Sequence, residues 1–209
     1  MNTTLSILNR SLKALAFAGL ALALSQCAAV NKSNSSLDFD PPTKPVKNPA
    51  NVRVKISTSA QRVYVMEGSE VLLATPCCVG PDGTSAATPK GNFTIYSKVA
   101  NRRRVSSPGA GYPMTFWMEF KSAYGMHWGW VHPTPKTHGC VRLPIKSAQK
   151  IFSMVRTGTP LNIAVSQPED ATIGKTLPVL NDSTLADPPD SYMMSSKVFE
   201  DAAKGKMYY

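Results

Sequence analysis

The sequence predicts a mainly β domain, a sandwich or barrel, with one short helix late in the chain. Several short segments alternate apolar and polar residues or are rich in aromatic and β-branched residues, and turn residues separate them at close spacing. This is the pattern of an all-β sandwich or barrel. Hydrophobic residues make up 43% of the 209-residue chain and charged residues 17%, which is typical of a globular domain with a single core.

Two segments alternate most clearly, residues 52–57 and 62–66, and each is expected to be a half-buried strand. A turn at residues 67–69 leads into residues 70–75, so the second segment and this one predict a hairpin. Aromatic and β-branched residues, or renewed alternation, mark the remaining strands. These are expected at residues 92–97, 114–120 and 161–165.

The main helix is expected over residues 148–155, where apolar residues recur at helical spacing. Ser147 is placed to cap its start, and Gly158 and Pro160 end it. A second, short helix is expected near the C-terminus, at residues 198–203.

The first 29 residues look like an export signal. Arg10 and Lys13 precede an apolar run at residues 14–24 that is too short to span a membrane comfortably. Processing after residue 29 would release a periplasmic protein. The chain is therefore expected in the bacterial cell envelope.

A second processing route stays open, because Leu24-Ser25-Gln26-Cys27 resembles a lipobox. Cleavage after residue 26 would leave a lipidated Cys27 that attaches the protein to the membrane. Gln26 departs from the small residue that this motif prefers.

Three further regions are expected. Residues 30–50 are rich in Asn, Ser, Pro and Lys and predict a flexible tether. Residues 51–167 form the folded domain, and residues 168–209 turn polar and predict a poorly packed C-terminal extension.

The formal net charge is +10, but Arg102-Arg103-Arg104 is the basic run and no aromatic residues are interleaved with it. A solvated loop is therefore expected there, and nucleic acid is not expected as a partner. Cys77 and Cys78 are adjacent, so their side chains should point to opposite faces of a strand and be buried.

All three histidines of the protein, His127, His132 and His138, lie in one segment shortly before Cys140. A thiol is mostly protonated at neutral pH and needs a neighbouring imidazole or dipole to react as a thiolate. Gly139 lets the backbone turn sharply, so that the N–H groups of Gly139 and Cys140 could form an oxyanion hole. Together these residues predict a cysteine nucleophile for acyl transfer.

Arg142 would lie on the same side as Cys140 if this segment is extended. Its guanidinium could then bind a carboxylate with two parallel hydrogen bonds. The acyl donor is accordingly expected to be a peptide with acidic groups. A structural ion pair of Arg142 is the alternative.

The segment Thr137-His138-Gly139-Cys140-Val141-Arg142 resembles the Ser/Thr-His-Gly-Cys-x-Asn/Arg signature of YkuD-type L,D-transpeptidases. His127, in Tyr-Gly-Met-His, resembles the upstream histidine of that family. The likeness covers about residues 51–166. It includes residues 88–93, which resemble the family's T-P-x-G-x-F segment.

The resemblance implies a barrel-like β-sandwich with a short helix after the Cys motif, and no cofactor or metal. It implies that the substrates are peptidoglycan stem peptides. The cysteine would attack the carbonyl after the third residue of a tetrapeptide stem and expel the terminal D-alanine. An amine of a second stem, or in some members a protein lysine or water, would then take the acyl group.

Carried onto this chain, the family's roles make Cys140 the nucleophile and His127 the general base and later proton donor. The backbone of His138 would orient His127, and the N–H of Gly139 would bind the oxyanion. Thr137 and Arg142 would contact the substrate. One departure is that the interval from His127 to Cys140 is shorter than in many members.

Several alternatives remain at this point. His132 could be the base in place of His127, although a rigid strand position suits a base better. His127, His132, His138 and Cys140 could instead hold zinc as a His3Cys set. The chain could also be an L,D-carboxypeptidase that uses water as acceptor, or an inactive wall-binding module.

Overall fold

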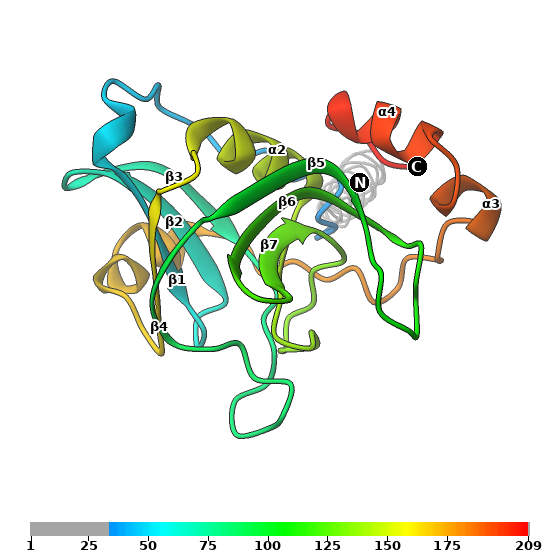
Figure 1. Cartoon of the computed structure of the whole chain (residues 1–209). Helices are drawn as coiled ribbons and strands as arrows, with labels where there is room; N and C mark the ends of the chain where they lie inside the picture. Colours follow the sequence, from blue (N-terminus) through cyan, green and yellow to red (C-terminus); the bar gives the residue numbers. More distant parts are fainter. Residues whose placement is uncertain (1–33, 209) are drawn as a thin grey trace, which may run out of the picture. The chain divides into compact units, whose positions relative to one another are not determined.

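The computed structural model describes residues 34–208. The expected export signal, residues 1–29, and Cys27 with it lie outside the described residues. Nine strands form two sheets in the described part of the chain (Figure 1). The strands are β1 (Val52–Ser57), β2 (Arg62–Glu67), β3 (Glu70–Pro76), β4 (Gly91–Thr94), β5 (Ser97–Arg103), β6 (Pro113–Lys121), β7 (Tyr124–Trp128), β8 (Val141–Leu143) and β9 (Pro160–Ala164).

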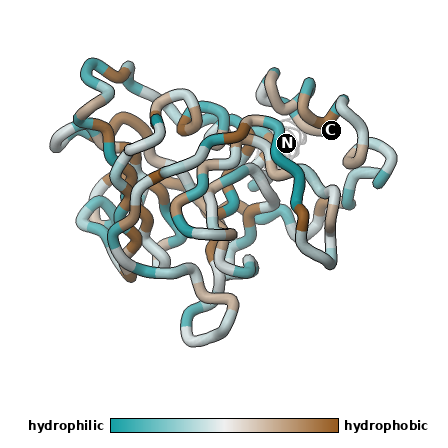
Figure 2. Tube along the Cα trace, viewed as in Figure 1, coloured by the Kyte–Doolittle hydropathy of each residue, from teal (hydrophilic) through white to brown (hydrophobic). Residues whose placement is uncertain are grey.

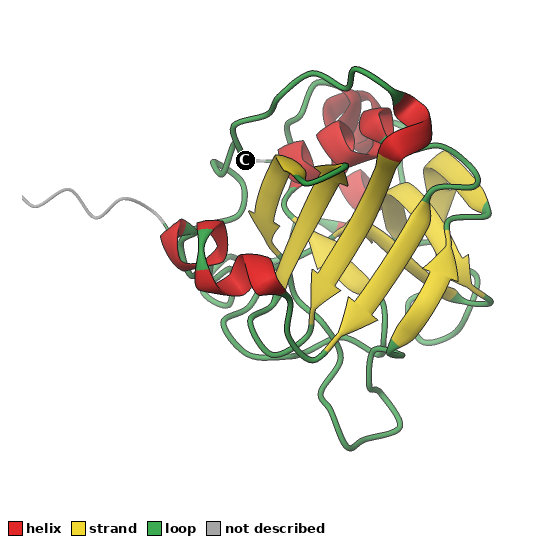
Figure 3. Ribbon diagram, turned by 90° about the vertical axis from the view of Figure 1, so that its left-hand side faces the viewer, coloured by secondary structure: helices red, strands yellow, loops and turns green. Residues whose placement is uncertain are grey.

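The first sheet has the order β3-β2-β1-β9-β4 and the second the order β5-β6-β7-β8. The predicted hairpin of β2 and β3 is confirmed, since Val65 on β2 pairs with Leu73 on β3 in an antiparallel register. Two neighbouring pairs are parallel, β1 with β9 and β7 with β8. Figure 3 shows the strands crossing the molecule, with helices at the top of the view and a second group at its left-hand side.

Both sheets pack on one hydrophobic core. Val54 and Ile56 of β1, Met118 of β6 and Leu143 of β8 belong to the same buried cluster, as does Ile151 of helix α2 (Ile145–Met154). In Figure 2 brown residues recur along the strands, whereas the protruding loop between β3 and β4 is mostly pale or teal. The expected mainly β sandwich with one main short helix is confirmed.

Helix α2 begins earlier than the apolar spacing indicates. Pro144 is its N-cap residue and makes no side-chain cap bond, so the expected cap by Ser147 is wrong. The Ser147 hydroxyl is fully buried and lies 2.7 Å from the Thr75 hydroxyl of β3. Proline suits a helix start because its missing N–H has no intrahelical partner there.

The strand expected at residues 92–97 is two strands in different sheets. β4 ends at Thr94 and β5 begins at Ser97, with Ile95 fully buried between them. The Ile95 N–H donates to the Thr159 carbonyl oxygen, which helps the chain to cross from one sheet to the other.

The basic run at residues 102–104 is not the solvated loop that its composition predicts. Arg102 and Arg103 belong to β5, and the Arg102 guanidinium lies 4.7 Å above the ring of Trp117. Arg103 donates to backbone carbonyls near the C-terminus. The guanidinium groups of Arg102 and Arg103 are therefore bound within the protein, whereas a solvated loop would have left them to water.

Residues 34–50 also differ from the expected flexible tether. Ser36 is fully buried, and its N–H and hydroxyl both donate to the carboxylate of Asp182, at 2.8 and 2.6 Å. The N–H of Lys44 donates to the Leu72 carbonyl oxygen of β3, and a short 3-10 helix, η1 (Pro49–Asn51), leads into β1. Side chain–backbone bonds order this segment despite its polar composition.

The C-terminal extension is packed, so the expected poor packing is wrong. It contains η2 (Pro168–Ala171), η3 (Ile173–Thr176), α3 (Asp190–Met193) and α4 (Lys197–Ala203), and α4 confirms the short helix predicted at 198–203. Met193, Val198 and Met207 are buried in the main core. Within residues 34–208, no helix has the length and apolar character needed to cross a bilayer.

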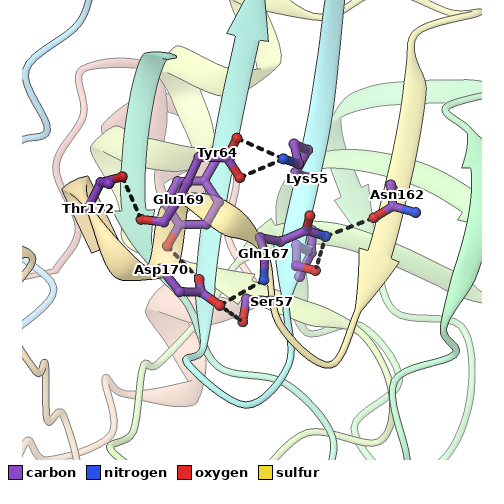
Figure 4. Close-up of polar contacts among 9 residues, drawn as sticks. Lys55, Ser57, Tyr64, Asn162, Gln167, Glu169, Asp170 and Thr172 are labelled. Atoms are coloured by element: carbon purple, nitrogen blue, oxygen red, sulfur yellow. Dashed lines mark hydrogen bonds and ion pairs between the residues drawn. The ribbon is translucent and has the colours of Figure 1, made fainter. Parts of the chain in front are cut away.

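Polar contacts fasten the start of this extension to the outer face of the first sheet (Figure 4). The carboxylate of Asp170 accepts from the hydroxyls of Ser57 and Tyr64, each at 2.7 Å. Beside it, Lys55 and Glu169 form an ion pair with a nitrogen–oxygen distance of 2.5 Å. A buried polar network in which each group has a partner fixes one arrangement of the chain.

Candidate active site

The pairing of β7 with β8 brings the predicted catalytic residues together. His127 on β7 is the register partner of Arg142 on β8. Side chains alternate along a strand, so Cys140, two residues before Arg142, lies on the same face as Arg142 and His127. Cys140 and Gly125 directly precede the paired residues Val141 and Met126, and the backbone N–H of Gly125 interacts with the Cys140 thiol. Gly125 has no side chain to crowd the sulfur.

This face borders a cleft of about 590 Å³, within the usual size of a small-molecule site. Five of the residues singled out in the sequence line it, namely His127, Thr137, His138, Cys140 and Arg142. Gly139 lies within the same loop. The remaining lining includes two arginines, Arg102 and Arg104, and the three tryptophans Trp117, Trp128 and Trp130.

His127 is held as a buried, neutral imidazole. Burial lowers the pKa of His127 to about 4, although its hydrogen bond to the Trp128 carbonyl acts in the opposite direction. Its Nδ1 lies 2.5 Å from that carbonyl oxygen. A carbonyl only accepts, so Nδ1 carries the proton, and Nε2 is left with a lone pair that can take a proton.

The orienting partner of His127 differs from the expected one. The backbone of His138 was expected to hold the ring, but the carbonyl of Trp128 does so. The reason is local, since Trp128 directly follows His127 on the same strand. From the other side the Trp117 ring packs against the imidazole, with ring centroids 5.6 Å apart. The side chain of His138 is exposed and lines the cleft.

Cys140 is half-buried and its thiol is protonated at rest. Burial raises the pKa of the Cys140 thiol, and the backbone N–H of Gly125 and the charge of Arg142 oppose this only in part. At neutral pH the thiol is therefore protonated and donates to the Ala123 carbonyl oxygen at 3.8 Å, and the neutral imidazole of His127 lines the same cleft. The arrangement suits general-base removal of the thiol proton during attack, instead of a thiolate already present at rest.

Hydrogen bonds of the Thr137 side chain shape the loop before Cys140. Its hydroxyl donates to the Cys140 carbonyl oxygen at 2.6 Å and accepts from the Gly139 N–H at 3.1 Å. Thr137 is 3% exposed. Its hydroxyl is thus engaged within the loop, which makes it a positioning residue and not the substrate contact that we expected.

The same bond corrects the expected role of Gly139. Its N–H is already donated to Thr137, so it is not available for an oxyanion. The N–H of Cys140 makes no hydrogen bond within the described part of the chain. Gly139 is needed for another reason, since its φ is +104° and a Cβ there would lie 2.3 Å from Cε1 of Tyr124.

Arg142 forms no ion pair with any carboxylate of residues 34–208. Its backbone is fixed, because its N–H and carbonyl both bond to Cys78 at 2.9 Å. Its side chain runs across Gly129, where a Cβ would come within 2.8 Å of the Arg142 Cδ. The alternative of a structural ion pair is therefore not what the structure shows.

His132 lies outside the cleft. It lines a separate cavity of about 90 Å³ together with Gln61 and Cys77. The four candidate zinc ligands are thus not gathered around one point. Across residues 34–208, no three His, Cys, Asp or Glu side chains are grouped closely enough to hold a metal ion.

Four residues lie at the site without having been expected there from the sequence: Arg102, Arg104, Gly125 and Asp187. Glycine in Tyr-Gly-Met-His offered a signal for Gly125, because a Cβ there would lie 2.8 Å from ring atoms of Trp117. Asp187 lines the cleft from the C-terminal extension, and no motif marks it. Cys77 and Cys78 are buried, as expected, and pack in two different clusters.

The sequence matches the family model for the L,D-transpeptidase catalytic domain, YkuD, over residues 51–163, which is more than half of the chain. The chain belongs to this family. No protein with a curated description matches it. The matched residues hold β1 to β8, all but the last residue of β9, the Cys140 loop and His127, whereas Asp187, Pro188 and Met193 of the cleft lining lie beyond the match.

Solved structures of L,D-transpeptidases are similar to this chain at low identity. One from Stackebrandtia nassauensis is 22% identical with a TM-score of 0.49, and the match covers 60% of each chain. One from Xylanimonas cellulosilytica is 23% identical with a TM-score of 0.48, covering 59% of this chain and 64% of that one. One from Mycobacterium smegmatis is 21% identical with a TM-score of 0.46, covering 55% and 58%. The chain thus spans less than two thirds of each of them.

Proposed function

We propose that this L,D-transpeptidase family member transfers an acyl group between peptidoglycan stem peptides, with Cys140 as the nucleophile and His127 as the general base. The observation that carries the proposal is the placement of Cys140, His127 and Arg142 on one face of the β7–β8 pair, in an open cleft. The three residues supply a thiol, a neutral imidazole and an unpaired guanidinium. In acyl transfer from an acidic peptide, the thiol can attack, the imidazole can move the proton and the guanidinium can bind a carboxylate.

In the first half-reaction, Nε2 of His127 takes the proton of the Cys140 thiol as the sulfur attacks the donor carbonyl carbon. The negative charge that develops on the carbonyl oxygen is stabilised by the N–H of Cys140. His127 then gives its proton to the leaving nitrogen, the carbon–nitrogen bond breaks, and the terminal D-alanine departs. A thioester on Cys140 remains.

In the second half-reaction, an acceptor amine attacks the thioester carbonyl and His127 takes a proton from its nitrogen. A carbon–nitrogen bond forms, the carbon–sulfur bond breaks, and the sulfur recovers the proton. Buried between Trp117 and the Trp128 carbonyl, the imidazole stays in place for both proton transfers. Preorganisation of this kind is a main source of enzymatic rate enhancement.

Arg142 supports an acidic donor. Its guanidinium lines the cleft without a carboxylate partner among residues 34–208. A stem peptide carries carboxylates close to the bond that is cleaved. A guanidinium can bind one of them through two parallel hydrogen bonds, which fixes orientation as well as charge.

The first test is mass spectrometry after incubation with a carbapenem, a β-lactam that acylates cysteine in this family. We expect one adduct on the wild type and none on Cys140→Ala. Cys77→Ala and Cys78→Ala are matched controls that should keep the adduct, because both thiols are buried away from the cleft. A folded wild type that takes up no adduct would point to a binding module without catalysis.

The second test is digestion of purified wall material followed by muropeptide analysis. New crosslinks between two third residues are expected from the wild type and not from Cys140→Ala. Products shortened by one D-alanine, with no new crosslinks, would assign a carboxypeptidase instead. Attached protein fragments would show that a lysine is the acceptor.

We also propose that residues 1–29 direct export, since the proposed substrate lies outside the cytoplasm. Cell fractionation of the full chain should place it in the envelope. Labelling with a radioactive fatty acid, compared between the wild type and Cys27→Ala, would decide between a lipoprotein and a periplasmic protein.

A further inference from the structure

One wall of the cleft comes from outside the L,D-transpeptidase domain. The family match ends at residue 163, whereas Asp187, Pro188 and Met193 of the C-terminal extension line the cleft beside Cys140 and His127. This wall therefore lies beyond the residues that the family model matches.

The wall is anchored by Arg103. Its guanidinium donates to the carbonyl oxygens of Met193 at 2.8 Å and Ser195 at 2.8 Å, and also to that of Gly111 at 2.7 Å. The Tyr112 hydroxyl donates to the Asp190 carboxylate at 2.9 Å. Both contacts join the extension to the β5–β6 hairpin. The position of Asp187 is thus set by the fold.

Asp187 is the one acidic residue among the described residues that line the cleft, and it faces a basic lining of Arg102, Arg104 and Arg142. Its carboxylate accepts from the Trp130 indole N–H at 3.4 Å and forms no ion pair within residues 34–208. Trp130 follows Gly129, across which Arg142 runs. Asp187 and Arg142 therefore contact the neighbouring residues Trp130 and Gly129, but they form no ion pair with each other.

Separated charges of opposite sign suit a substrate that carries both. The arginines attract the carboxylates of the donor, but they repel an acceptor amine, which is a cation near neutral pH. A carboxylate in the cleft offsets this repulsion, and Asp187 is the one that the described part of the lining offers. We propose that Asp187 binds the ammonium group of the acyl acceptor and so selects amines over water.

The proposal rests on the proposed function, because it concerns the second half-reaction. The acceptor arrives as an ammonium ion held by Asp187 and releases one proton to solvent. The resulting amine attacks the thioester carbonyl and gives a second proton through His127 to the departing sulfur. One carbon–nitrogen bond forms and one carbon–sulfur bond breaks, with the release of one proton overall.

The test compares two acceptors of the same acyl-enzyme, formed from a tetrapeptide donor at pH 7. Nα-acetyl-lysinamide presents a charged primary amine, whereas hydroxylamine is largely uncharged and should not need Asp187. Mass spectrometry measures the ratio of lysinamide transfer product to hydroxamate. We expect Asp187→Asn to lower this ratio about three- to fivefold, as for the loss of one exposed ion pair.

Two control variants define the result. Asp187→Glu keeps the charge and should restore most of the ratio. Glu200→Gln removes an exposed carboxylate from the same extension, outside the cleft lining and away from the contacts that anchor the wall, and should leave the ratio unchanged. An equal ratio in the wild type and Asp187→Asn would overturn the inference while leaving the proposed function intact. Absence of hydroxamate from the wild type would overturn the proposed function itself, and the inference with it.

Discussion

Nδ1 of His127 lies 2.5 Å from the carbonyl oxygen of Trp128, the next residue in the chain. The imidazole is thus oriented by its own strand and needs no carboxylate partner to fix its tautomer. The cost is that this hydrogen bond only partly offsets what disfavours a positive charge on the ring, namely its burial and the nearby charge of Arg142. This one contact determines how the site should respond to pH.

The acylation rate should fall at low pH only well below the ordinary pKa of histidine. Only the neutral imidazole can accept a proton, so activity is retained above the pKa of His127, which burial lowers to about 4, and is lost as pH falls through that value. Carbapenem adduct formation, followed by mass spectrometry from pH 3.5 upward, measures this. A fall in the acylation rate near pH 6.5, the ordinary pKa of histidine, would show that the ring is less buried than in the structure.

Replacing each histidine in turn should identify the base. His127→Ala should slow carbapenem acylation about 10²- to 10⁴-fold, the usual contribution of a general base. His132→Ala should have little effect, because His132 lines the other cavity. His138→Ala is the matched control within the cleft, since its exposed ring has no expected part in proton transfer. Greater damage from His132→Ala than from His127→Ala would reverse the assignment.

Much of this site could be predicted from the sequence because backbone periodicity and one dense motif determine it. Alternation over Val52–Ser57 predicted β1 to the residue. Cys140, His127 and Arg142 were expected together, and their strands pair so that all three share a face. The alternation of apolar and polar residues is a local property of the sequence. It can be recognised wherever one face of a strand is buried and the other is exposed.

The missed parts depend on contacts between distant residues. β5 has a mostly exposed central stretch, so the sequence around Arg102 shows no alternation to read. The C-terminal extension is polar and rich in proline, yet Arg103 and Asp170 bind it to the sheets. Composition predicts poor packing in such a segment because it carries no information on which side chain will satisfy which backbone group.

Gly139→Ala should lower both stability and acylation. An alanine at this position must adopt a φ of +104°, which is strained for a residue with a side chain. Its Cβ would lie 2.3 Å from the Tyr124 ring, so the loop that carries Cys140 has to move. Gly158→Ala is the matched control, because its φ is +95° and nothing lies within 4 Å of the new Cβ. The control should cost about 1–2 kcal/mol of unfolding free energy from backbone strain alone.

Urea unfolding and carbapenem acylation together separate the two effects in these variants. Gly139→Ala should unfold at lower urea than Gly158→Ala and should lose most of its acylation, whereas Gly158→Ala should keep it. If both variants acylate at the wild-type rate, the turn at Gly139 does not position the thiol.

Removal of residues 34–50 should destabilise the domain, although the family match begins only at residue 51. The carboxylate of Asp182 is 2% exposed and accepts from Ser36 and from the Val131 N–H. A chain that begins at Asn51 loses the Ser36 donors and keeps a buried, poorly paired charge. The expected loss is about 2–4 kcal/mol of unfolding free energy, measured against a chain that begins at Asn34.

Asp182→Asn in both chains tests whether this carboxylate is the cause. Once the charge is gone, truncation should cost less, so the two changes should be strongly non-additive in a double-mutant cycle. The short chain should also acylate more slowly. The Asp182 carboxylate holds the Val131 N–H, and Val131 directly follows Trp130, which lines the cleft, so a loosened contact should disturb the cleft wall. Additive losses would mean that residues 34–50 stabilise the domain through other contacts, such as the bond from Lys44 to Leu72.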